Sequence, residues 1–194
     1  MPKLVDHEKK KKHIAEATWR VIVEQGMERV TVRNIAKEAG ISLGSLRHYF
    51  STQEELLSYS MNLVKDKVTA RIMKIATQQL PLKEKALKML LELVPTDKES
   101  MAEAEVWFTF IAYTRHKEQF DANQDGVFLG IQQLMQYLQQ YNLLKTDIDL
   151  ELETERLYAV IDGLALHAML NPKRVNRDLA EKILVHHLEQ ICQV

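Results

Sequence analysis

Residues 31–50, TVRNIAKEAGISLGSLRHYF, predict two short helices that are joined by a tight glycine turn. Thr31 is a candidate N-cap, because its hydroxyl can accept a hydrogen bond from an amide of the first helical turn. Gly40 stands where the end of a helix favours a left-handed residue, and Ser42 can cap the helix that follows. Two helices separated by so short a break cross at a steep angle, as in a helix-turn-helix that places its second helix in the DNA major groove.

The composition favours an all-α fold. The chain has 194 residues, which is long enough for one or two domains with buried cores. Six Gly and four Pro leave little material for a turn-rich β protein. No apolar run of membrane-spanning length and no secretion signal are recognised, and the lone Cys192 fits a reducing compartment. A cytoplasmic protein without a membrane segment is therefore expected.

Charge is distributed unevenly along the chain. Residues 1–50 hold ten Lys and Arg against six Asp and Glu, whereas the remainder holds sixteen against twenty-one. A basic end suggests contact with phosphate, although an excess of this size is also common on soluble surfaces. Residues 1–8 are expected to be a loose arm, followed by the basic run Lys9 to Lys12. That run is either a solvated helix start or part of an arm that reaches phosphates or the minor groove.

Hydrophobic periodicity predicts helices throughout the rest of the chain. A capping-box pattern, Ser51 with Glu54 three residues on, opens the helix after the motif. We expect a DNA-binding domain at residues 1–50 and a second domain at residues 51–194, linked by this helix. Outside the motif, the expected helices run from Glu8 to Gln25, Ser51 to Gln79, Leu82 to Val94, Lys98 to Lys117, Asp121 to Tyr141, Asp149 to Leu170 and Arg177 to Ile191.

Many positions between residues 10 and 60 follow a set spacing without gaps. They are Ile14, Ala17, Val21-Ile22, Gly26, Thr31-Val32-Arg33, Ile35-Ala36, Ala39-Gly40-Ile41-Ser42, Gly44-Ser45-Leu46, Tyr49-Phe50 and Glu54-Glu55-Leu56. This pattern resembles the DNA-binding domain of TetR-family transcriptional regulators. The helix that contains Trp107, together with Asp162-Gly163-Leu164 and Asn171-Pro172, resembles the C-terminal domain of the choline-responsive BetI-like branch.

The resemblance implies an all-α homodimer. Each subunit would hold a three-helix DNA-binding domain with a helix-turn-helix on a larger helical domain for ligand binding and dimerisation. Its function would be that of a sequence-specific transcriptional repressor, released from its operator by a small-molecule effector and needing no cofactor. A ligand-independent DNA-binding regulator or an activator is the alternative, although a second domain of about 140 residues exceeds what dimerisation alone requires.

The resemblance also implies which residues contact DNA. Arg33 could read a guanine, a contact that discriminates by about 1–3 kcal/mol, or it could pair with Glu28 or Glu38 on the surface. At Gln53 the family often carries Lys, so a shallower salt dependence is expected here. The full set of expected contacts is Thr31, Arg33, Ser42, Leu43, Gly44, Ser45, Arg47, His48, Tyr49 and Gln53.

The second domain offers candidates for a ligand pocket and for a dimer interface. An aromatic cluster could line a pocket, although such a stripe is more often plain core. The pocket candidates are Met101, Trp107, Phe110, Met135 and His167. The last two helices are expected to pair with their counterparts in a four-helix interface. The interface candidates are Leu157, Ile161, Gly163, Leu164, Leu179, Ile183 and Leu188.

Catalysis and metal binding are not expected. His186 and His187 are adjacent on a predicted helix and therefore point about 100° apart, so they cannot both bind one ion in the ordinary way. Cys192 has no His partner nearby in sequence, and no nucleophile motif is present. The sequence thus favours a DNA-binding protein over an enzyme.

Overall fold

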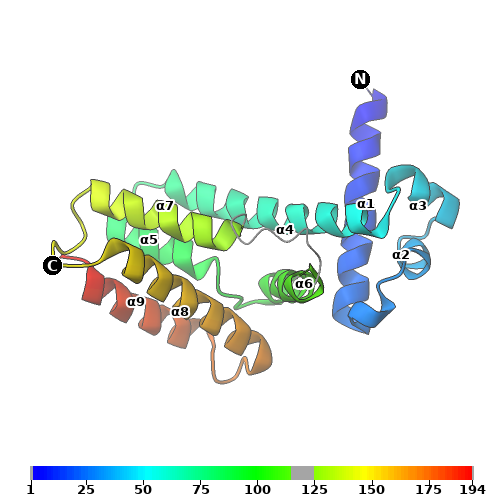
Figure 1. Cartoon of the computed structure of the whole chain (residues 1–194). Helices are drawn as coiled ribbons and strands as arrows, with labels where there is room; N and C mark the ends of the chain where they lie inside the picture. Colours follow the sequence, from blue (N-terminus) through cyan, green and yellow to red (C-terminus); the bar gives the residue numbers. More distant parts are fainter. Residues whose placement is uncertain (1, 115–124, 194) are drawn as a thin grey trace. The chain divides into compact units, whose positions relative to one another are not determined.

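The computed structural model describes residues 2–114 and 125–193, and within them the only regular elements are helices (Figure 1). This confirms the all-α prediction. An isolated β-bridge between Leu144 and Cys192 is the one extended pairing in these ranges. The helices are α1 (Pro2–Gln25), the 3₁₀ turn η1 (Met27–Arg29), α2 (Val32–Glu38), α3 (Leu43–Tyr49), α4 (Gln53–Ala76), α5 (Leu82–Leu91), α6 (Lys98–Thr114), α7 (Gly126–Gln140), α8 (Leu150–Leu170) and α9 (Arg177–Ile191).

Contacts between residues divide the chain into two compact units. The first contains Met1–Lys67 with Ala102–Phe120, and the second contains Val68–Met101 with Asp121–Val194. The first unit extends past the boundary expected near residue 50, because the start of α4 packs on α1. There the indole N–H of Trp19 donates a hydrogen bond to the carbonyl oxygen of Ser60 over 3.1 Å.

In the first unit, α1, α2 and α3 pack on one another (Figure 1). The turns between them use glycine where the backbone requires it, since Gly26 has φ 76° and Gly40 has φ 65°. The predicted caps are confirmed: the Thr31 hydroxyl accepts from the Asn34 amide at 3.2 Å, and the Ser42 hydroxyl accepts from the Ser45 amide at 3.0 Å. The core of the unit includes Ile14, Val21, Ile35, Leu46, Phe50 and Leu56, each at most 1% exposed.

The beginnings of α1 and α4 differ from the prediction. Helix α1 already begins at Pro2, so the described residues of the expected loose arm are helical. The predicted Ser51–Glu54 capping box is wrong. Instead, the Glu55 amide donates to the Thr52 hydroxyl at 3.0 Å, and the Glu55 carboxylate accepts from the Ser51 amide and hydroxyl at 2.8 and 2.9 Å. These hydrogen bonds from Ser51 lower the pKa of the Glu55 carboxyl.

Several other helix ends are also shifted. Helix α4 ends at Ala76 rather than Gln79, and α5 ends at Leu91 rather than Val94. The expected end at Lys117 and the expected start at Asp121 lie outside the described residues. The predicted helix from Arg177 to Ile191 is confirmed at both ends. Asn176 caps the N-terminus of α9, where its side chain accepts a hydrogen bond from the Leu179 amide at 3.0 Å.

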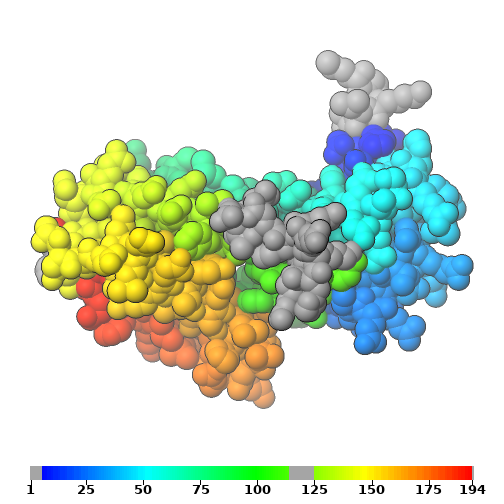
Figure 2. All heavy atoms as spheres, in the orientation of Figure 1, coloured from blue at the N-terminus to red at the C-terminus, as the bar shows by residue number. Residues whose placement is uncertain are grey.

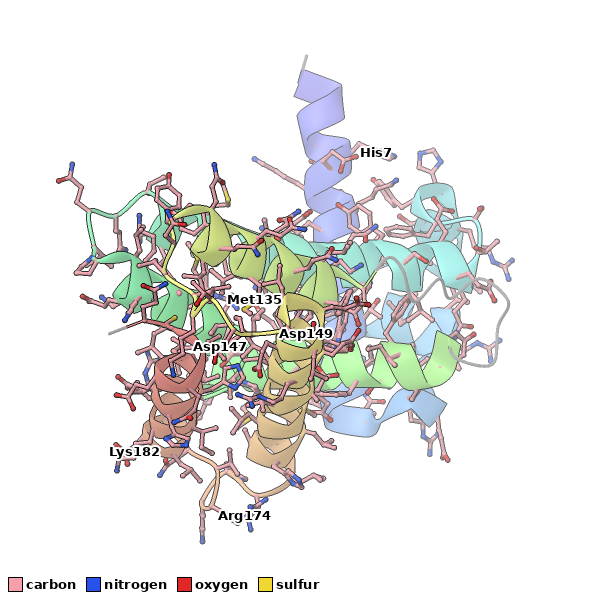
Figure 3. The ribbon with its side chains drawn as sticks, turned by 60° about the vertical axis from the view of Figure 1, so that its left-hand side comes forward. His7, Met135, Asp147, Asp149, Arg174 and Lys182 are labelled. Atoms are coloured by element: carbon pink, nitrogen blue, oxygen red, sulfur yellow. The ribbon has the colours of Figure 1, made fainter. Side chains whose placement is uncertain are left out.

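In the second unit, α5, α7, α8 and α9 enclose an apolar core, to which Ile131, Met135, Leu138, Leu157 and Leu184 each contribute a fully buried side chain. Figure 3 shows Met135 among these helices, and in Figure 2 the surfaces of α7 and α8 adjoin. After α9 the chain returns to the loop that follows α7 in the sequence. There the backbone amide of Lys145 donates a hydrogen bond to the carbonyl oxygen of Ile191 at 2.9 Å. Cys192 is buried there, and burial raises the pKa of its thiol, which makes it a poor nucleophile.

Candidate nucleic-acid interface

Helix α3 has one buried face and one exposed polar face. Leu46 is 0% and Phe50 is 1% exposed, so both side chains anchor the helix in the first unit. Arg47 and His48 lie on the exposed face, and Gly44 is exposed at its start. An exposed helix face that carries a guanidinium and an imidazole can bind phosphate oxygens or the acceptor atoms of base edges.

Nothing in the described part of the chain requires glycine at position 44. Its φ is not positive, and the nearest atom that an added Cβ would meet is the Ser42 hydroxyl oxygen at 3.9 Å. A small residue on the exposed face of a recognition helix lets a large ligand approach the backbone closely. Gly44 is therefore consistent with its predicted place at a DNA surface.

Arg33 and Arg47 are exposed, and no ion pair within the described part of the chain involves either. Glu38, one of the expected alternative partners of Arg33, is held elsewhere. Its carboxylate accepts from the Arg20 guanidinium at 2.6 Å. Both arginines therefore present their donors to solvent at the two helices of the motif, where they are available to DNA.

Gln53 is engaged within the first unit. Its side-chain amide donates to the carbonyl oxygen of Val30 over 2.7 Å. One of its two amide hydrogens is thereby occupied, so a phosphate contact at this position would use the other. This contact could not be predicted from the sequence, because Val30 lies 23 residues away along the chain.

The remaining predicted DNA contacts lie at or near the caps of the motif. Thr31 and Ser42 are exposed and accept the capping hydrogen bonds, which leaves each hydroxyl hydrogen available as a donor. Leu43, Ser45 and Tyr49 are half-buried. Contacts with DNA at these ten positions stay a prediction.

Three further residues hold the motif in place and were not identified from the sequence. The His13 imidazole Nε2 lies 3.0 Å from the carbonyl oxygen of Ala39, at the turn between α2 and α3. The Asn34 side chain donates to the Arg29 carbonyl at 2.9 Å. The His7 ring centroid lies 4.9 Å from that of Tyr49 and 6.3 Å from that of His48.

The predicted ligand-pocket residues do not form one group. Met135 is fully buried in the apolar core of the second unit, where Met101 packs half-buried, and His167 is exposed. Trp107 and Phe110 belong to the first unit, and the ammonium of Lys65 lies 5.6 Å from the centre of the Trp107 ring. A pocket at these residues stays a prediction.

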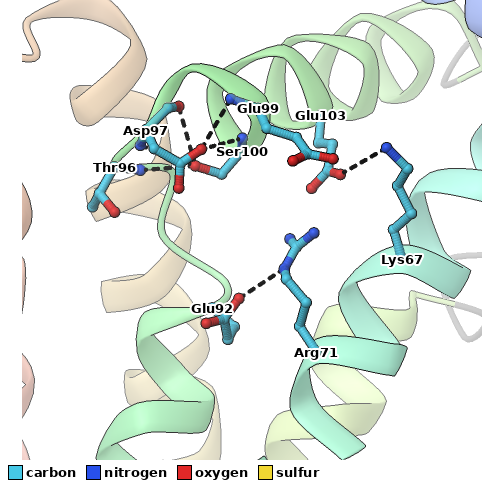
Figure 4. A network of polar contacts seen from close by, with 8 residues as sticks. All are labelled: Lys67, Arg71, Glu92, Thr96, Asp97, Glu99, Ser100 and Glu103. Atoms are coloured by element: carbon cyan, nitrogen blue, oxygen red, sulfur yellow. Dashed lines mark hydrogen bonds and ion pairs between the residues drawn. The ribbon is translucent and has the colours of Figure 1, made fainter. Parts of the chain in front are cut away.

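The second unit contains a polar cavity of about 150 Å³. Arg71, Glu92, Asp97 and Arg177 line it, and Figure 4 shows the contacts of the first three. The Arg71 guanidinium donates to the Glu92 carboxylate at 2.8 Å. The Asp97 carboxylate accepts from the backbone amide of Ser100 at 2.9 Å, which lowers its pKa. This cavity is smaller than the roughly 300–1,000 Å³ that hold drug-sized ligands.

A second polar cluster of this unit joins α7 to α8. The Tyr158 hydroxyl donates to the Asp125 carboxylate at 2.8 Å, and the other oxygen of Asp125 caps α7 by accepting from the Val127 amide at 2.8 Å. Burial and the nearby Asp125 charge raise the pKa of the Asp162 carboxyl. Burial also raises the pKa of the Tyr158 hydroxyl, which keeps it a neutral donor.

Four predicted interface residues are enclosed by the chain itself. Leu157 and Ile161 are 0% and 1% exposed, and Leu164 and Leu188 are also buried. They belong to the core of the second unit, so a partner chain would have to contact other residues of the same helices. Leu179 and Ile183 are half-buried against this core.

The accessible side of α8 carries an apolar stripe of its own. It consists of Leu152, Ala159, Gly163, Leu166 and Leu170, spaced seven, four, three and four residues apart. Leu152, Leu166 and Leu170 are 63%, 40% and 70% exposed. A Cβ added at Gly163 would meet no atom of the described residues within 4 Å. This spacing is typical of helices that pack against another helix.

The described residues show no metal site and no membrane-spanning helix. No group of three or more His, Cys, Asp or Glu side chains among them could hold a metal ion. No described helix is both long enough and apolar enough to cross a bilayer.

Comparison with known proteins identifies both parts of the chain. Residues 14–59 match the model of bacterial regulatory proteins of the tetR family, and residues 81–193 match the C-terminal model of BetI-type transcriptional repressors. The HTH-type transcriptional regulator PksA of Bacillus subtilis is 59% identical over 99% of this chain and 94% of its own length. The regulator BetI of Vibrio campbellii is 28% identical over 98% of this chain and 96% of its own length.

Solved structures agree with this assignment. A transcriptional regulator from Rhodococcus sp. Rha1 matches with a TM-score of 0.82 and 26% identity, over 95% of this chain and 98% of that one. A transcriptional regulator from Saccharomonospora viridis, solved in complex with choline, shares the fold with a TM-score of 0.79 and 20% identity, over 96% of this chain and 100% of that one. The chain belongs to the TetR family of DNA-binding transcriptional regulators and carries a C-terminal domain of the BetI type.

Proposed function

We propose that this regulator is a homodimeric repressor that leaves its operator when a small molecule binds the helical second unit. The observation that carries the proposal is the exposed polar face of α3. Arg47, His48 and Gly44 lie on it, whereas Leu46 and Phe50 anchor its other side. A helix of this kind fits the major groove, where an arginine can contact guanine O6 and N7.

The apolar stripe on α8 supports the dimer. Exposed leucines at heptad-like spacing are costly in water and are buried when a second copy of the helix packs against them. Gly163 lies in the middle of the stripe with open space above it, which allows two backbones to approach closely. A two-fold pair presents two copies of α3, as an operator with two half-sites requires.

The effector is the less specified part of the proposal. The BetI-type match of residues 81–193 and the choline complex of the Saccharomonospora structure support a small organic molecule as effector. The cavity that Arg71, Asp97 and Arg177 line is one place in the second unit where a small polar molecule has room. An effector can release DNA only to the extent that it binds the DNA-free conformation more tightly than the DNA-bound one.

A selection experiment tests this function. Purified protein would be used to select binding sites from random double-stranded DNA, and the selected site would then be titrated at fixed salt concentration. Thermal-shift screening of choline, other small amines and hydrophobic compounds would identify effectors, and each one that shifts the melting temperature would be added to the complex with DNA. Enrichment of a two-half-site sequence and its release by an effector support the proposal. A selected site that no effector releases would favour the ligand-independent regulator.

A further inference from the structure

The second turn of α1 is held against the end of the recognition helix. The His7 ring lies 4.9 Å from the Tyr49 ring and 6.3 Å from the His48 ring, and these last two rings lie 5.4 Å apart. His48 is exposed, and His7 and Tyr49 are partly exposed. Figure 3 shows His7 on α1 within the first unit. Two imidazoles and a phenol thus form one accessible cluster at the C-terminal end of α3.

Two other contacts fix this part of α1 in place. The Lys11 ammonium lies 5.4 Å from the centre of the Phe50 ring and 5.5 Å from that of the Tyr59 ring, a cation–π arrangement. One oxygen of the Glu8 carboxylate accepts from the Tyr59 hydroxyl at 3.4 Å. His7 therefore sits on a docked helix rather than on a free arm, and its ring has a defined position beside α3.

The chemistry of the cluster suits a phosphodiester oxygen. Imidazole N–H groups and a phenol O–H are donors to phosphate, and a protonated imidazole adds a positive charge. In a helix-turn-helix the recognition helix lies in the major groove, so groups that flank the helix meet the sugar–phosphate backbone at the groove's edge. Lys10, exposed and one turn from His7 on α1, adds positive charge nearby.

We propose that His7 binds a DNA backbone phosphate, and that with His48 and Tyr49 it forms one phosphate-binding cluster built from α1 and α3. This inference rests on the proposed binding of an operator by α3 and extends that surface to α1. The titratable groups in contact with His7 are Glu8 on α1 and His48 and Tyr49 on α3. Glu8 Oε1 lies 3.9 Å from His7 Nδ1, so the charge of this carboxylate opposes the approach of a phosphate.

The test compares four variants of the full-length protein: His7→Ala, His7→Phe, His7→Lys and, as a matched control, His186→Ala on the exposed surface of α9. Affinity for the selected DNA would be measured over a range of salt concentrations at pH 6. His7→Ala is expected to bind about three- to tenfold more weakly at pH 6 and to lower the salt slope by about one per bound chain.

The other variants separate charge from packing. His7→Phe keeps a ring against Tyr49 but has no donor, so it should bind as weakly as His7→Ala. His7→Lys brings back a donor and should restore affinity. Full affinity of His7→Phe would show that the ring only supports Tyr49, and an unchanged salt slope of His7→Ala would show that no phosphate is bound; either result overturns the inference. If the wild-type protein itself bound no DNA, the proposed function and this inference would both fall.

Discussion

The side-chain amide of Gln53 donates a hydrogen bond to the carbonyl oxygen of Val30, which ties the first residue of α4 to the loop that precedes α2. The resemblance to the family implies a lysine at this position, where the chain has a neutral amide, so we expect its DNA binding to depend less steeply on salt concentration.

Replacing Gln53 with Lys should restore that charge. The expected result is a plot of log affinity against log salt that is steeper by about 0.9 per bound chain, because one more phosphate counterion is released. The control Gln53→Ala removes the bond to Val30 and should lower the free energy of unfolding by about 1 kcal/mol while leaving the slope unchanged. An unchanged slope in Gln53→Lys would place this residue away from the phosphate backbone.

Gly44→Ala should separate stability from DNA binding. The added methyl group has room in the free protein and removes the helix-forming disadvantage of glycine, which raises the free energy of unfolding by up to about 1 kcal/mol. The same methyl group would keep DNA from the backbone, so affinity for the selected site should fall. Gly130→Ala, an exposed glycine inside α7, is the control that gains stability without losing affinity. Equal affinities of Gly44→Ala and Gly130→Ala would show that Gly44 does not lie against DNA.

His187 should make the fold sensitive to acid. It is 6% exposed, its Nε2 has no hydrogen-bond partner among the described residues, and burial together with Arg156 and His186 lowers its pKa to about 4. An unfolded histidine titrates near 6.5, so between pH 6.5 and pH 4 the unfolded chain binds more protons. Stability should therefore fall as the pH drops through this window, by about 3 kcal/mol at most.

Chemical denaturation at pH 7 and pH 4.5 checks this expectation. His187→Gln should lose less stability between the two pH values than the wild-type protein, because it has no proton to gain. His186→Gln removes the smallest of the causes that lower the pKa of His187, so this variant should lose nearly as much stability as the wild type. If His187→Gln lost as much stability between the two pH values as the wild type, the acid sensitivity would arise from other groups, such as carboxylates.

The α8 stripe predicts which substitutions break the proposed dimer. Leu170→Glu and Gly163→Glu each place a carboxylate on the proposed contact and should shift the protein from dimer to monomer in sedimentation equilibrium. Met73→Glu is the matched control, because Met73 is an exposed apolar residue at 58% that lies on α4 and outside the stripe. Persistence of the dimer in both α8 variants would mean that the subunits meet through another surface.

Much of the architecture could be predicted because its signals are local. The hydroxyls of Thr31 and Ser42 accept hydrogen bonds from backbone amides only three residues further along the chain. The helix Arg177–Ile191 begins after an Asn cap and ends where its apolar periodicity ends. The capping box at α4 was misplaced by one residue, because Ser51 and Thr52 can both cap and only the backbone geometry selects Thr52.

Long-range contacts could not be predicted in the same way. Helix α8 is apolar on two sides, and its period does not say which side faces its own core; Leu157 and Ile161 proved to be core, whereas Leu166 and Leu170 are accessible. Gln53 contacts Val30, which lies 23 residues away along the chain, and His7 contacts Tyr49, which lies 42 residues away. Only the packed fold brings such pairs together.

The most direct test of the account is the affinity of Arg33→Ala and Arg47→Ala for the DNA site selected by the wild-type protein, with Arg174→Ala in the second unit as control. Arg33→Ala and Arg47→Ala should each bind this site at least about tenfold more weakly, because each loses a contact worth about 1–3 kcal/mol. Both variants should remain folded and keep the oligomeric state of the wild type. Arg174→Ala should match the wild type. Wild-type affinity in both Arg33→Ala and Arg47→Ala would contradict the assignment of α2 and α3 as the surface that reads DNA.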